Sequence, residues 1–467
     1  MEGCYQTVPM NMKRFGDYVF ADAQDLLNEE FCCDCGKNHS AWPLEYLRIG
    51  KGAVSLCPDG LRTLSVKKPY IVMGTNGYRV AGEKVLSDLD AEKIPYKLLV
   101  IPADPRILPN EHYTELVERE FEESCDFILG IGSGVINDLC KLVAFRHSLR
   151  AGVVATAPSM DGYASNSSAM ELGGVKTTVY TVCPSLILCD TEIMRNAPYD
   201  MIQSGFGDMA AKIISIADWE IAHLVTGEYY CPHVADMMLR AYHEIISNVQ
   251  RISERDENAI RIMTEGLVLS GIASSFTGVS RPASGMEHSV SHLLEMFALA
   301  RGSEPAFHGL QVGYGVRAAL KLYDIVMKTD FSESKMLVAA EQFDEAHWEE
   351  EMKAVFGEQS DVLIANALRE ERNSRNSMIR RGRASLSHRK EIRTIMQKVL
   401  EQRDELEAAL DYMGIADLKA PEELGYTKKE AVNAVLYSKD LRARYIFTSL
   451  CSDLGILDGE KIEAMIS

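Results

Sequence analysis

The stretch "GIGSGVINDLCK", which runs from Gly130 to Lys141, decides the fold that this sequence predicts. It follows a short apolar run, "DFIL", that is typical of a buried strand, and it continues with the periodicity of a helix. Small residues at such a turn let the backbone approach a phosphate, and a helix start offers free N–H groups to an anion. The stretch therefore indicates either a pyrophosphate-binding turn or a tight turn without a ligand, and the candidate binding residues are Gly130, Gly132, Ser133 and Gly134.

Other apolar runs repeat the pattern on both sides of this turn. They are rich in β-branched residues or Leu, they contain a Gly, Pro or Asp at or near their ends, and segments of helical periodicity separate them. Strands and helices that alternate in this way predict an α/β domain whose parallel sheet is covered on both faces. The predicted strands are 69–74, 97–104, 126–134, 150–159 and 185–190.

The pattern changes at about residue 198, after which amphipathic helical segments follow one another. In "PHVADMMLRAYHEIISNVQRI", residues such as Val234, Met238 and Ile245 recur at helical spacing, which is typical of a helix packed on a core. The predicted organisation is an N-terminal extension (1–43), an α/β dinucleotide-binding domain (44–197) and an all-α domain that binds metal and substrate (198–467).

The composition narrows the possible functions. Among 467 residues, 46% are apolar and 25% charged, as in ordinary globular proteins, and the net charge of -19 disfavours binding to nucleic acid or an anionic membrane. The opening "MEGCYQTVPMNMKRFGDYVF" lacks the apolar core of a signal peptide, and we expect no transmembrane helix. Eleven cysteines, mostly scattered singly, indicate reduced thiols and a cytoplasmic protein.

One cysteine cluster is different. "FCCDCGKNH" contains Cys32, Cys33, Cys35 and His39, and a zinc knuckle is conceivable there. A single C-x-C-x3-H nevertheless lacks the second pair of ligands that structural zinc sites usually have. An ordinary turn before the first strand is therefore favoured over a structural metal.

The basic run "REERNSRNSMIRRGRASLSHRK" (369–390) invites a nucleic-acid interpretation. It lacks the interleaved aromatic residues of a single-strand platform, contains glutamates and belongs to a strongly acidic chain. A solvated helical hairpin is the favoured interpretation.

Four further stretches carry possible chemistry. "TAPSMDGYASNSSA" (156–169) follows a strand and offers hydroxyls and the carboxylate of Asp161, although a polar turn would look similar. In "SGFGDMAAKIISIADW" (204–219), Asp208 is either a helix N-cap or a ligand, and Lys212 lies one turn further along the same face.

The remaining two stretches contain histidines. "SGMEHSVSH" (284–292) places His288 and His292 one helical turn apart, and "FHGLQVGYG" follows with His308. Three interpretations of His288 and His292 are open: two ligands of one metal, one ligand and one proton carrier, or ordinary helix residues. Asp208, His288 and His308 together would form a two-histidine, one-carboxylate site that suits a divalent transition metal.

Taken in this order, the stretches resemble the iron-containing alcohol dehydrogenase superfamily, and within it the sn-glycerol-1-phosphate dehydrogenases. The resemblance rests on "GIGSGVINDLCK", "TAPSMDGYAS", "GFGDMAAK", "SRPASGMEHSVSH" and "HGLQVG", and it extends from about residue 30 to residue 457. It implies that Asp208, His288 and His308 bind a divalent metal, with zinc favoured and nickel or iron as alternatives. It also implies a nicotinamide cofactor held at the glycine-rich turn, with Asn76, Asp138, Thr156, Ser159 and Ser165 as further cofactor residues.

The implied reaction is reduction of dihydroxyacetone phosphate to sn-glycerol 1-phosphate by NADH or NADPH. Asp161, His292 and Lys212 are the expected catalytic residues, and Lys212 and Arg281 are the expected partners of the substrate phosphate. The resemblance further implies a homodimer. The alternatives are a glycerol or polyol dehydrogenase that needs no phosphate, a dehydroquinate-synthase-like cyclase, and a silent homologue with a role in assembly.

One departure from the family pattern concerns the cofactor. The family usually has Asp-x-Asn-Thr after the first strand, and its Asp holds the adenosine ribose hydroxyls. Here the stretch is "GTNG", so Gly74 replaces that Asp, and Arg79 is nearby in sequence. Loss of the carboxylate removes repulsion against a 2′-phosphate, so we expect NADPH to be accepted.

Overall fold

The computed structural model describes residues 26–467 except 28–29, 42, 105 and 174, so the expectation about the opening twenty residues lies outside the described part. The chain forms two compact units. The sheet unit comprises the described residues up to Met209 together with Cys231–Ala283, and the helical unit comprises Ala210–Tyr230 and Ser284–Ser467. Each unit therefore consists of two separate segments of the chain, whereas the three predicted domains are continuous ranges. The predicted domain boundaries stay a prediction.

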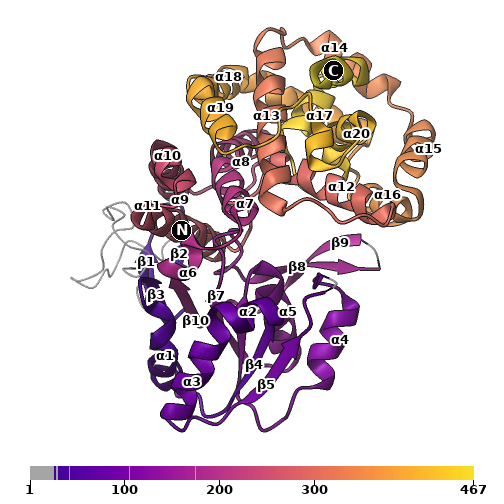
Figure 1. The fold of residues 1–467 in the computed structure, drawn as a ribbon. Coiled ribbons are helices and arrows are strands. Elements are labelled where there is room, and N and C mark those ends of the chain that lie inside the picture. The colour runs from indigo at the N-terminus through magenta and orange to yellow at the C-terminus, as the bar shows by residue number, and fades with distance from the viewer. Residues whose placement is uncertain (1–25, 28–29, 42, 105, 174) are drawn as a thin grey trace. The chain divides into compact units, whose positions relative to one another are not determined.

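The sheet unit is built on six parallel strands in the order β3-β10-β7-β6-β4-β5 (Figure 1). β6 lies in the middle of the sheet, with Gly130 paired to Val72 on one side and to Val153 on the other. All five predicted strands are present, which confirms the fold class. The edge strand β3 was not predicted. The strands are β3 (Tyr46–Gly50), β4 (Pro69–Gly74), β5 (Lys97–Ile101), β6 (Phe127–Gly132), β7 (Arg150–Ala155) and β10 (Leu186–Asp190).

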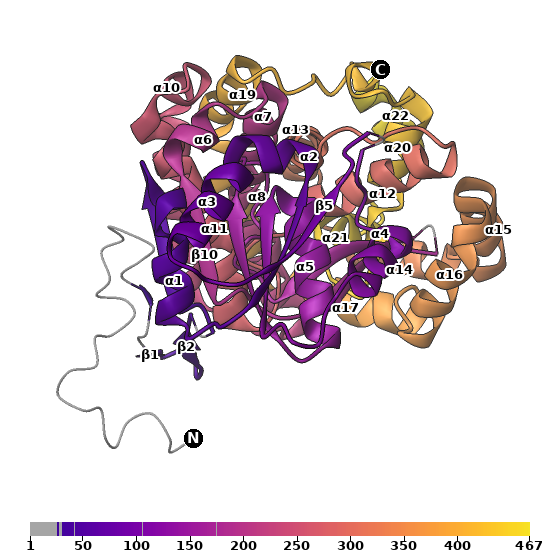
Figure 2. The ribbon, with the colours of Figure 1, turned by 60° about the horizontal axis from the view of Figure 1, so that its bottom comes forward.

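Helices cover both faces of this sheet, as the nearly continuous apolar strands require (Figure 2). On one face, Leu61 of α1 and Val85 of α3 pack with Ile71 and Leu129 of the sheet. On the other face, residues of α4 and α5 pack against the strand side chains that alternate with these. The helices are α1 (Cys57–Thr63), α2 (Thr75–Gly77), α3 (Glu83–Ala91), α4 (Glu111–Arg119) and α5 (Gly134–Arg146).

Two antiparallel hairpins accompany the main sheet. β8 (Ser167–Leu172) pairs with β9 (Val175–Tyr180), and β1 (Glu30–Cys32) pairs with β2 (Asn38–Ser40). The second hairpin contains the stretch "FCCDCGKNH", for which an ordinary turn was the favoured interpretation. That interpretation was incomplete, because the turn joins two strands. The strands were not predicted, because each has only three residues and shows no apolar alternation.

The rest of the sheet unit is helical. The predicted apolar stripe of "PHVADMMLRAYHEIISNVQRI" is buried at Val234, Met238 and Ile245. Among the described helices, only α11 is long and apolar enough to cross a membrane, and 83% of its most apolar stretch is buried within the structure, as in a core helix. The helices are α6 (Thr191–Arg195), α7 (Tyr199–Ala210), α9 (Pro232–Ser247), α10 (Val249–Ser253) and α11 (Glu257–Thr277).

The helical unit contains no strand among its described residues, as the change of pattern near residue 198 predicts. Its helices bury apolar stripes against one another, and α12 packs against α13 (Figure 1). The long helices are α8 (Lys212–Thr226), α12 (Met286–Ala300), α13 (His308–Met327), α14 (Glu333–Gln342), α15 (Glu345–Phe356) and α16 (Ser360–Arg369), followed by α17 (Arg375–Ser387), α18 (Arg389–Leu400), α19 (Arg403–Tyr412), α20 (Lys428–Leu436), α21 (Phe447–Asp453) and α22 (Gly459–Ile466).

Candidate functional site

The glycine-rich turn joins β6 to α5 at the carboxyl edge of the sheet. Ser133 is the N-cap of α5, and the helix begins at Gly134. A Cβ on Gly132 would lie 2.7 Å from Ile136 Cγ1, and one on Gly130 would lie 3.1 Å from Cys140 Sγ. These two glycines therefore let α5 pack directly on β6, which is a structural reason for their presence. The N–H groups at the start of α5 remain suited to an anion.

Asp138 and Lys141 pair on α5, with 3.0 Å between Asp138 Oδ1 and Lys141 Nζ. The pair is buried, because the Lys141 side chain is only 1% exposed and that of Asp138 only 12%. Lys141 Nζ also donates to the carbonyl of Gly162 at 3.1 Å and to Ser165 Oγ at 3.3 Å. The pair thus holds the predicted substrate loop, residues 156–169, against α5.

We expect Lys141→Ala to destabilise the protein by about 3–5 kcal/mol, because it leaves the Asp138 carboxylate buried without its cation. The measurement is the free energy of unfolding in urea. The control is Lys84→Ala, which breaks an exposed pair with Asp88 on α3 and should cost less than about 0.5 kcal/mol. Similar losses in both variants would contradict the role of Lys141 in holding the loop.

The substrate loop is also attached to α7 and α11 within the sheet unit. The N–H of Asp161 donates to Asp208 Oδ2 at 3.0 Å, and Ser270 Oγ donates to Asp161 Oδ2 at 2.7 Å. A Cβ on Gly205 would collide with the carbonyl oxygen of Pro158, so only glycine permits this approach of α7. The structure therefore brings together Asp161 and Asp208, two residues that the sequence predicted separately, and adds Ser270, which has no sequence signal.

Other predicted cofactor residues lie along the same sheet edge. The N–H of Thr156 donates to the carbonyl of Gly132 at 3.1 Å, which ties the end of β7 to the end of β6. The carbonyl of Ser159 accepts from Ser204 Oγ at 2.8 Å. Asn76 is exposed on α2 and accepts a hydrogen bond from Arg79.

The helical unit brings three predicted histidines together. The ring of His308 lies 5.3 Å from that of His288 and 5.6 Å from that of His292, measured between centroids. Within this unit, potential ligand atoms of His292, Glu295 and His308 also lie within 4.8 Å of one another. His308 is thus common to both histidine contacts, and the ring positions alone do not separate His288 from His292.

Glu287 gives His288 a different environment from His292. Its Oε1 lies 2.8 Å from His288 Nδ1 and accepts the N–H of Gly285 at 2.7 Å. A carboxylate on Nδ1 keeps the proton there and leaves Nε2 as the ligand atom, which is the usual arrangement of metal-binding histidines. This role of Glu287 has no signal in the sequence, because adjacent residues on a helix are not expected to face each other.

A tyrosine lies near this carboxylate. Burial raises the pKa of the Tyr323 hydroxyl well above its ordinary value, and the negative charges of Asp218 and Glu287 act in the same direction. Tyr323 therefore stays protonated at neutral pH and well above it.

The two predicted phosphate partners are buried. Lys212 is fully buried at the start of α8, and Arg281 is 1% exposed in the sheet unit.

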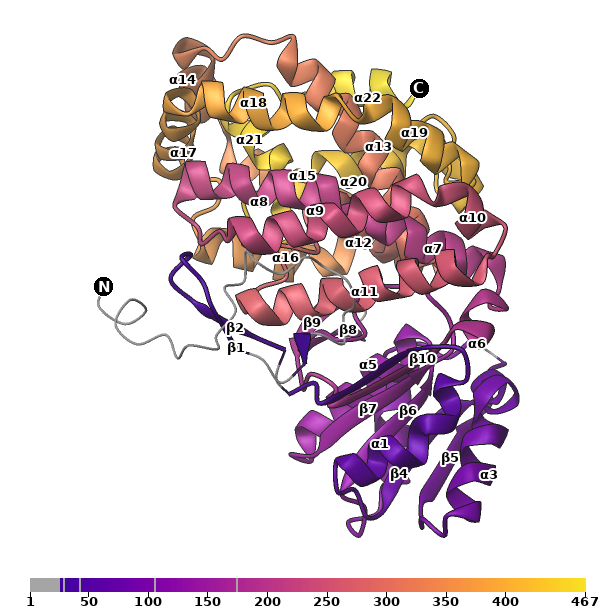
Figure 3. The same cartoon turned by 90° about the vertical axis from the view of Figure 1, so that its left-hand side faces the viewer.

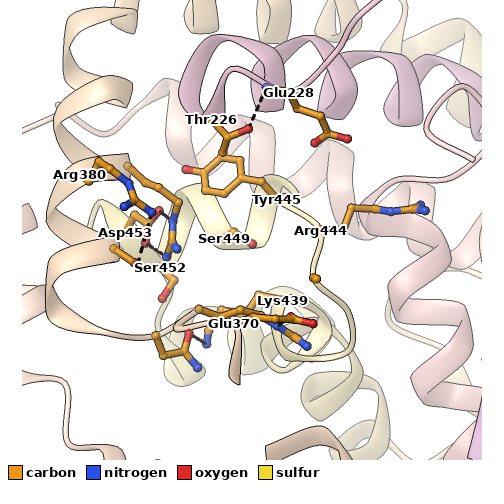
Figure 4. A pocket seen from close by; sticks show the side chains of 15 residues that line it. Thr226, Glu228, Glu370, Arg380, Lys439, Arg444, Tyr445, Ser449, Ser452 and Asp453 are labelled. Atoms are coloured by element: carbon orange, nitrogen blue, oxygen red, sulfur yellow. Dashed lines mark hydrogen bonds and ion pairs between the residues drawn. The ribbon is translucent and has the colours of Figure 1, made fainter. Parts of the chain in front are cut away.

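The basic run forms α17 and the first two residues of α18, which agrees with the helical part of the prediction, but it is only partly solvated. Three of its arginines, Arg372, Arg380 and Arg381, line a cavity of about 270 Å³ within the helical unit (Figure 4). Arg381 binds Asp453 through two hydrogen bonds of 2.8 Å. Burial raises the pKa of Asp453, and the hydrogen bonds from Arg381 oppose that shift. Acidic residues share the cavity, so it is not a purely basic surface.

The parallel sheet and the glycine-rich turn are typical of a dehydrogenase that uses a nicotinamide nucleotide, and a profile of the iron-containing alcohol dehydrogenases matches residues 48–198. The chain is 32% identical over 293 residues to a glycerol-1-phosphate dehydrogenase [NAD(P)+] from Halalkalibacterium halodurans, covering 62% of this chain and 73% of that protein. It is 33% identical over 301 residues to one from Bacillus licheniformis, covering 63% and 73%. The chain belongs to this family of iron-containing alcohol dehydrogenases.

Solved structures confirm the fold. The glycerol dehydrogenase from Schizosaccharomyces pombe superposes with a TM-score of 0.57 over 91% of each chain. Its sequence identity to this chain is only 14%, so the likeness concerns the fold and not the substrate.

Proposed function

We propose that this protein is an NAD(P)-dependent oxidoreductase that reduces dihydroxyacetone phosphate to sn-glycerol 1-phosphate and catalyses the reverse reaction. The observation that carries the proposal is the similarity, at 32–33% identity over most of their length, to relatives named for this activity. The glycine-rich turn at the start of α5 would bind the cofactor, and Asp208, His288 and His308 would bind the metal, which are the two binding functions that the reaction needs.

The cofactor pyrophosphate would be held at Gly130, Gly132, Ser133 and Gly134, where the N–H groups of α5 favour an anion. Asn76, Thr156, Ser159 and Ser165 are proposed as further cofactor residues. Asp138 was also predicted to be one, but its contacts with Lys141 and with the N–H of Ala169 support a positioning role.

The proposed metal ligands are Asp208, His288 and His308. The donor set fits a divalent metal, because Asp208 and His288 are buried, His308 is half-buried, and Glu287 directs Nε2 of His288 away from its own carboxylate. When bound, such an ion polarises a carbonyl oxygen and stabilises the negative charge that hydride transfer creates there. Zinc is favoured, and nickel or ferrous iron would suit the same donors.

The remaining residues have proposed roles in proton transfer and substrate binding. His292 or Asp161 would supply the proton that the product hydroxyl needs, and Ser270 fixes the Asp161 carboxylate for this purpose. Lys212 and Arg281 would bind the substrate phosphate. Both are buried cations, which suits a dianionic group taken out of water.

A substrate panel tests the activity. Dihydroxyacetone phosphate, dihydroxyacetone and glycerol would each be supplied with the appropriate nicotinamide, and the near-ultraviolet absorbance of the reduced cofactor would be followed. We expect kcat/KM to be highest with the phosphorylated triose. A preference for glycerol would instead identify a polyol dehydrogenase, and phosphate release without a change in absorbance would identify a cyclase.

We expect Gly74→Asp to shift the ratio of kcat/KM for NADPH and NADH about tenfold towards NADH, or roughly 1.4 kcal/mol. The new carboxylate would repel a 2′-phosphate and accept the hydroxyls of an unphosphorylated ribose. Its Cβ would meet only the end of the Ile107 side chain, at 2.9 Å, so the fold should tolerate the change. Gly74→Ala is the control for bulk without charge, and an equal shift in both variants would contradict the prediction.

Two further proposals concern the oligomeric state of the enzyme and its location in the cell. We infer a homodimer, which light scattering would show as twice the mass of the chain, and a cytoplasmic location, which cell fractionation would test. Nine of the ten described cysteines are free thiols, which suits this location, and Cys32 is disulfide-bonded.

A further inference from the structure

A second group of potential metal ligands lies entirely within the sheet unit. The turn between β1 and β2 and the strand that follows it contribute two cysteines and a histidine, and the start of α9 contributes a third cysteine. Figure 3 shows the hairpin beside α9 and α11. The ligand atoms all lie within 4.8 Å of one another; the residues are Cys33, Cys35, His39 and Cys231.

The distances between these atoms match one tetrahedral ion. Cys33 Sγ lies 3.7 Å from Cys231 Sγ, and His39 Nε2 lies 3.4 Å from Cys35 Sγ and 3.5 Å from Cys231 Sγ. Tetrahedral zinc, with Zn–S of about 2.3 Å and Zn–N of about 2.0 Å, places its ligand atoms about 3.5–3.8 Å apart. The four side chains therefore already have the spacing that zinc would impose.

Two backbone elements hold the cluster, namely the turn between β1 and β2 and the start of α9. The turn closes through a hydrogen bond of 3.2 Å from the Gly36 N–H to the Cys33 carbonyl, and Gly36 has a φ of +87°, which favours glycine. Cys231 is the N-cap of α9, so the start of this helix fixes the position of its side chain. The turn and the helix start thus place the sulfurs of Cys33 and Cys231 3.7 Å apart.

The histidine is held in the orientation of a ligand. His39 Nδ1 lies 2.9 Å from the carbonyl oxygen of Phe276 and must donate to it, so Nε2 carries the lone pair and faces the sulfurs. The ring also stacks on Phe276, with 5.6 Å between centroids and 27° between planes.

Neither a disulfide nor a set of ordinary core thiols accounts for this cluster. A disulfide between Cys33 and Cys231 would need about 2.05 Å between the sulfurs and would leave Cys35 and His39 without a role. Ordinary core thiols, such as Cys57 and Cys140, sit singly among apolar side chains in the two cores of the sheet unit. The cluster differs because three sulfurs and a ring nitrogen converge.

We propose that Cys33, Cys35, His39 and Cys231 bind a structural zinc ion, separate from the metal of the redox reaction. Binding would release three thiol protons and saturate the ion with protein ligands, which leaves no position for substrate. Soft thiolates select zinc over the hard divalent cations. The ion would join the β1–β2 hairpin to the start of α9, which lies almost two hundred positions further along the chain.

The first test measures the ion in a protein that lacks the proposed redox site. In the double variant His288→Ala/His308→Ala, purified after exposure to zinc and then to a chelating column, we expect one zinc per chain. X-ray absorption at the zinc edge should show three sulfurs and one nitrogen, with sulfur at about 2.3 Å. A first shell of oxygen and nitrogen only, or no retained zinc, would overturn the proposal.

The second test removes single ligands from the full-length enzyme. Cys35→Ser and Cys231→Ser should each lose one metal equivalent per chain and lower the melting temperature, while the active fraction keeps its kcat. Cys57→Ser, a buried thiol elsewhere in the sheet unit, is the matched control and should keep all of its metal. Unchanged metal content in Cys231→Ser would overturn the proposal, as would a Cys33–Cys231 disulfide in peptide maps. If a variant fails to fold, the absorption spectrum still decides.

Discussion

His288→Ala should lose one metal equivalent per chain and lower kcat/KM by about 10³-fold, whereas His292→Ala should keep its metal and lower kcat by about 10²-fold. The first loss corresponds to roughly 4 kcal/mol of charge stabilisation that a divalent ion supplies to a developing alkoxide. The second is typical of removing a group that handles a proton. The asymmetry follows from Glu287, which contacts His288 and holds its Nε2 as a ligand atom.

Metal analysis and steady-state kinetics on the same preparations measure the predicted metal content and the predicted loss of activity. Excess zinc should restore part of the activity of His288→Ala, because it raises occupancy, and should leave His292→Ala unchanged. The cysteine cluster would retain its own ion in both variants, so the expected change is the loss of one equivalent and not of all metal. Loss of metal in His292→Ala with retention in His288→Ala would reverse the assignment, and the group formed by His292, Glu295 and His308 would then be the better candidate.

The sequence predicted the architecture because burial leaves a strong signal. The central strands are buried on both faces and therefore read as continuous apolar runs, which locates β4, β6 and β10 to within two residues. β3 was missed because it lies at the sheet edge, has five residues and includes Arg48. The β8–β9 hairpin was missed because its strands are rich in Ser and Thr and resemble a loop.

The candidate site was predictable where its residues are neighbours in sequence. The spacing of His288 and His292 and the small residues at Gly130–Gly134 are local patterns. Contacts between distant segments were not predictable: the hydrogen bond from Ser270 to Asp161 and the approach of Cys231 to His39 depend on tertiary packing. For the same reason the cysteine stretch looked incomplete, because its fourth ligand begins a helix far along the chain.

Arg281→Ala should lower kcat/KM for dihydroxyacetone phosphate by about 100-fold or more and change that for dihydroxyacetone by less than about threefold. A buried cation that pairs with a phosphate contributes about 2–5 kcal/mol when its partner is present, and nothing to a substrate without the phosphate. Arg281 is 1% exposed, so water cannot replace its charge. The ratio of the two kcat/KM values therefore isolates phosphate recognition from any general loss of folding.

Two variants make this prediction specific. Arg281→Lys keeps the charge but not the two-pronged geometry, and should recover part of the loss with the phosphorylated triose. Arg240→Ala removes an exposed arginine of α9 that pairs with Asp236, and should leave both substrates unaffected. If Arg281 instead holds the fold, Arg281→Ala will lower both activities in parallel together with the melting temperature, and phosphate recognition will have to come from Lys212. If no substitution at Arg281 or Lys212 lowers kcat/KM selectively for the phosphorylated substrate, the protein would be better described as a polyol dehydrogenase of the same fold.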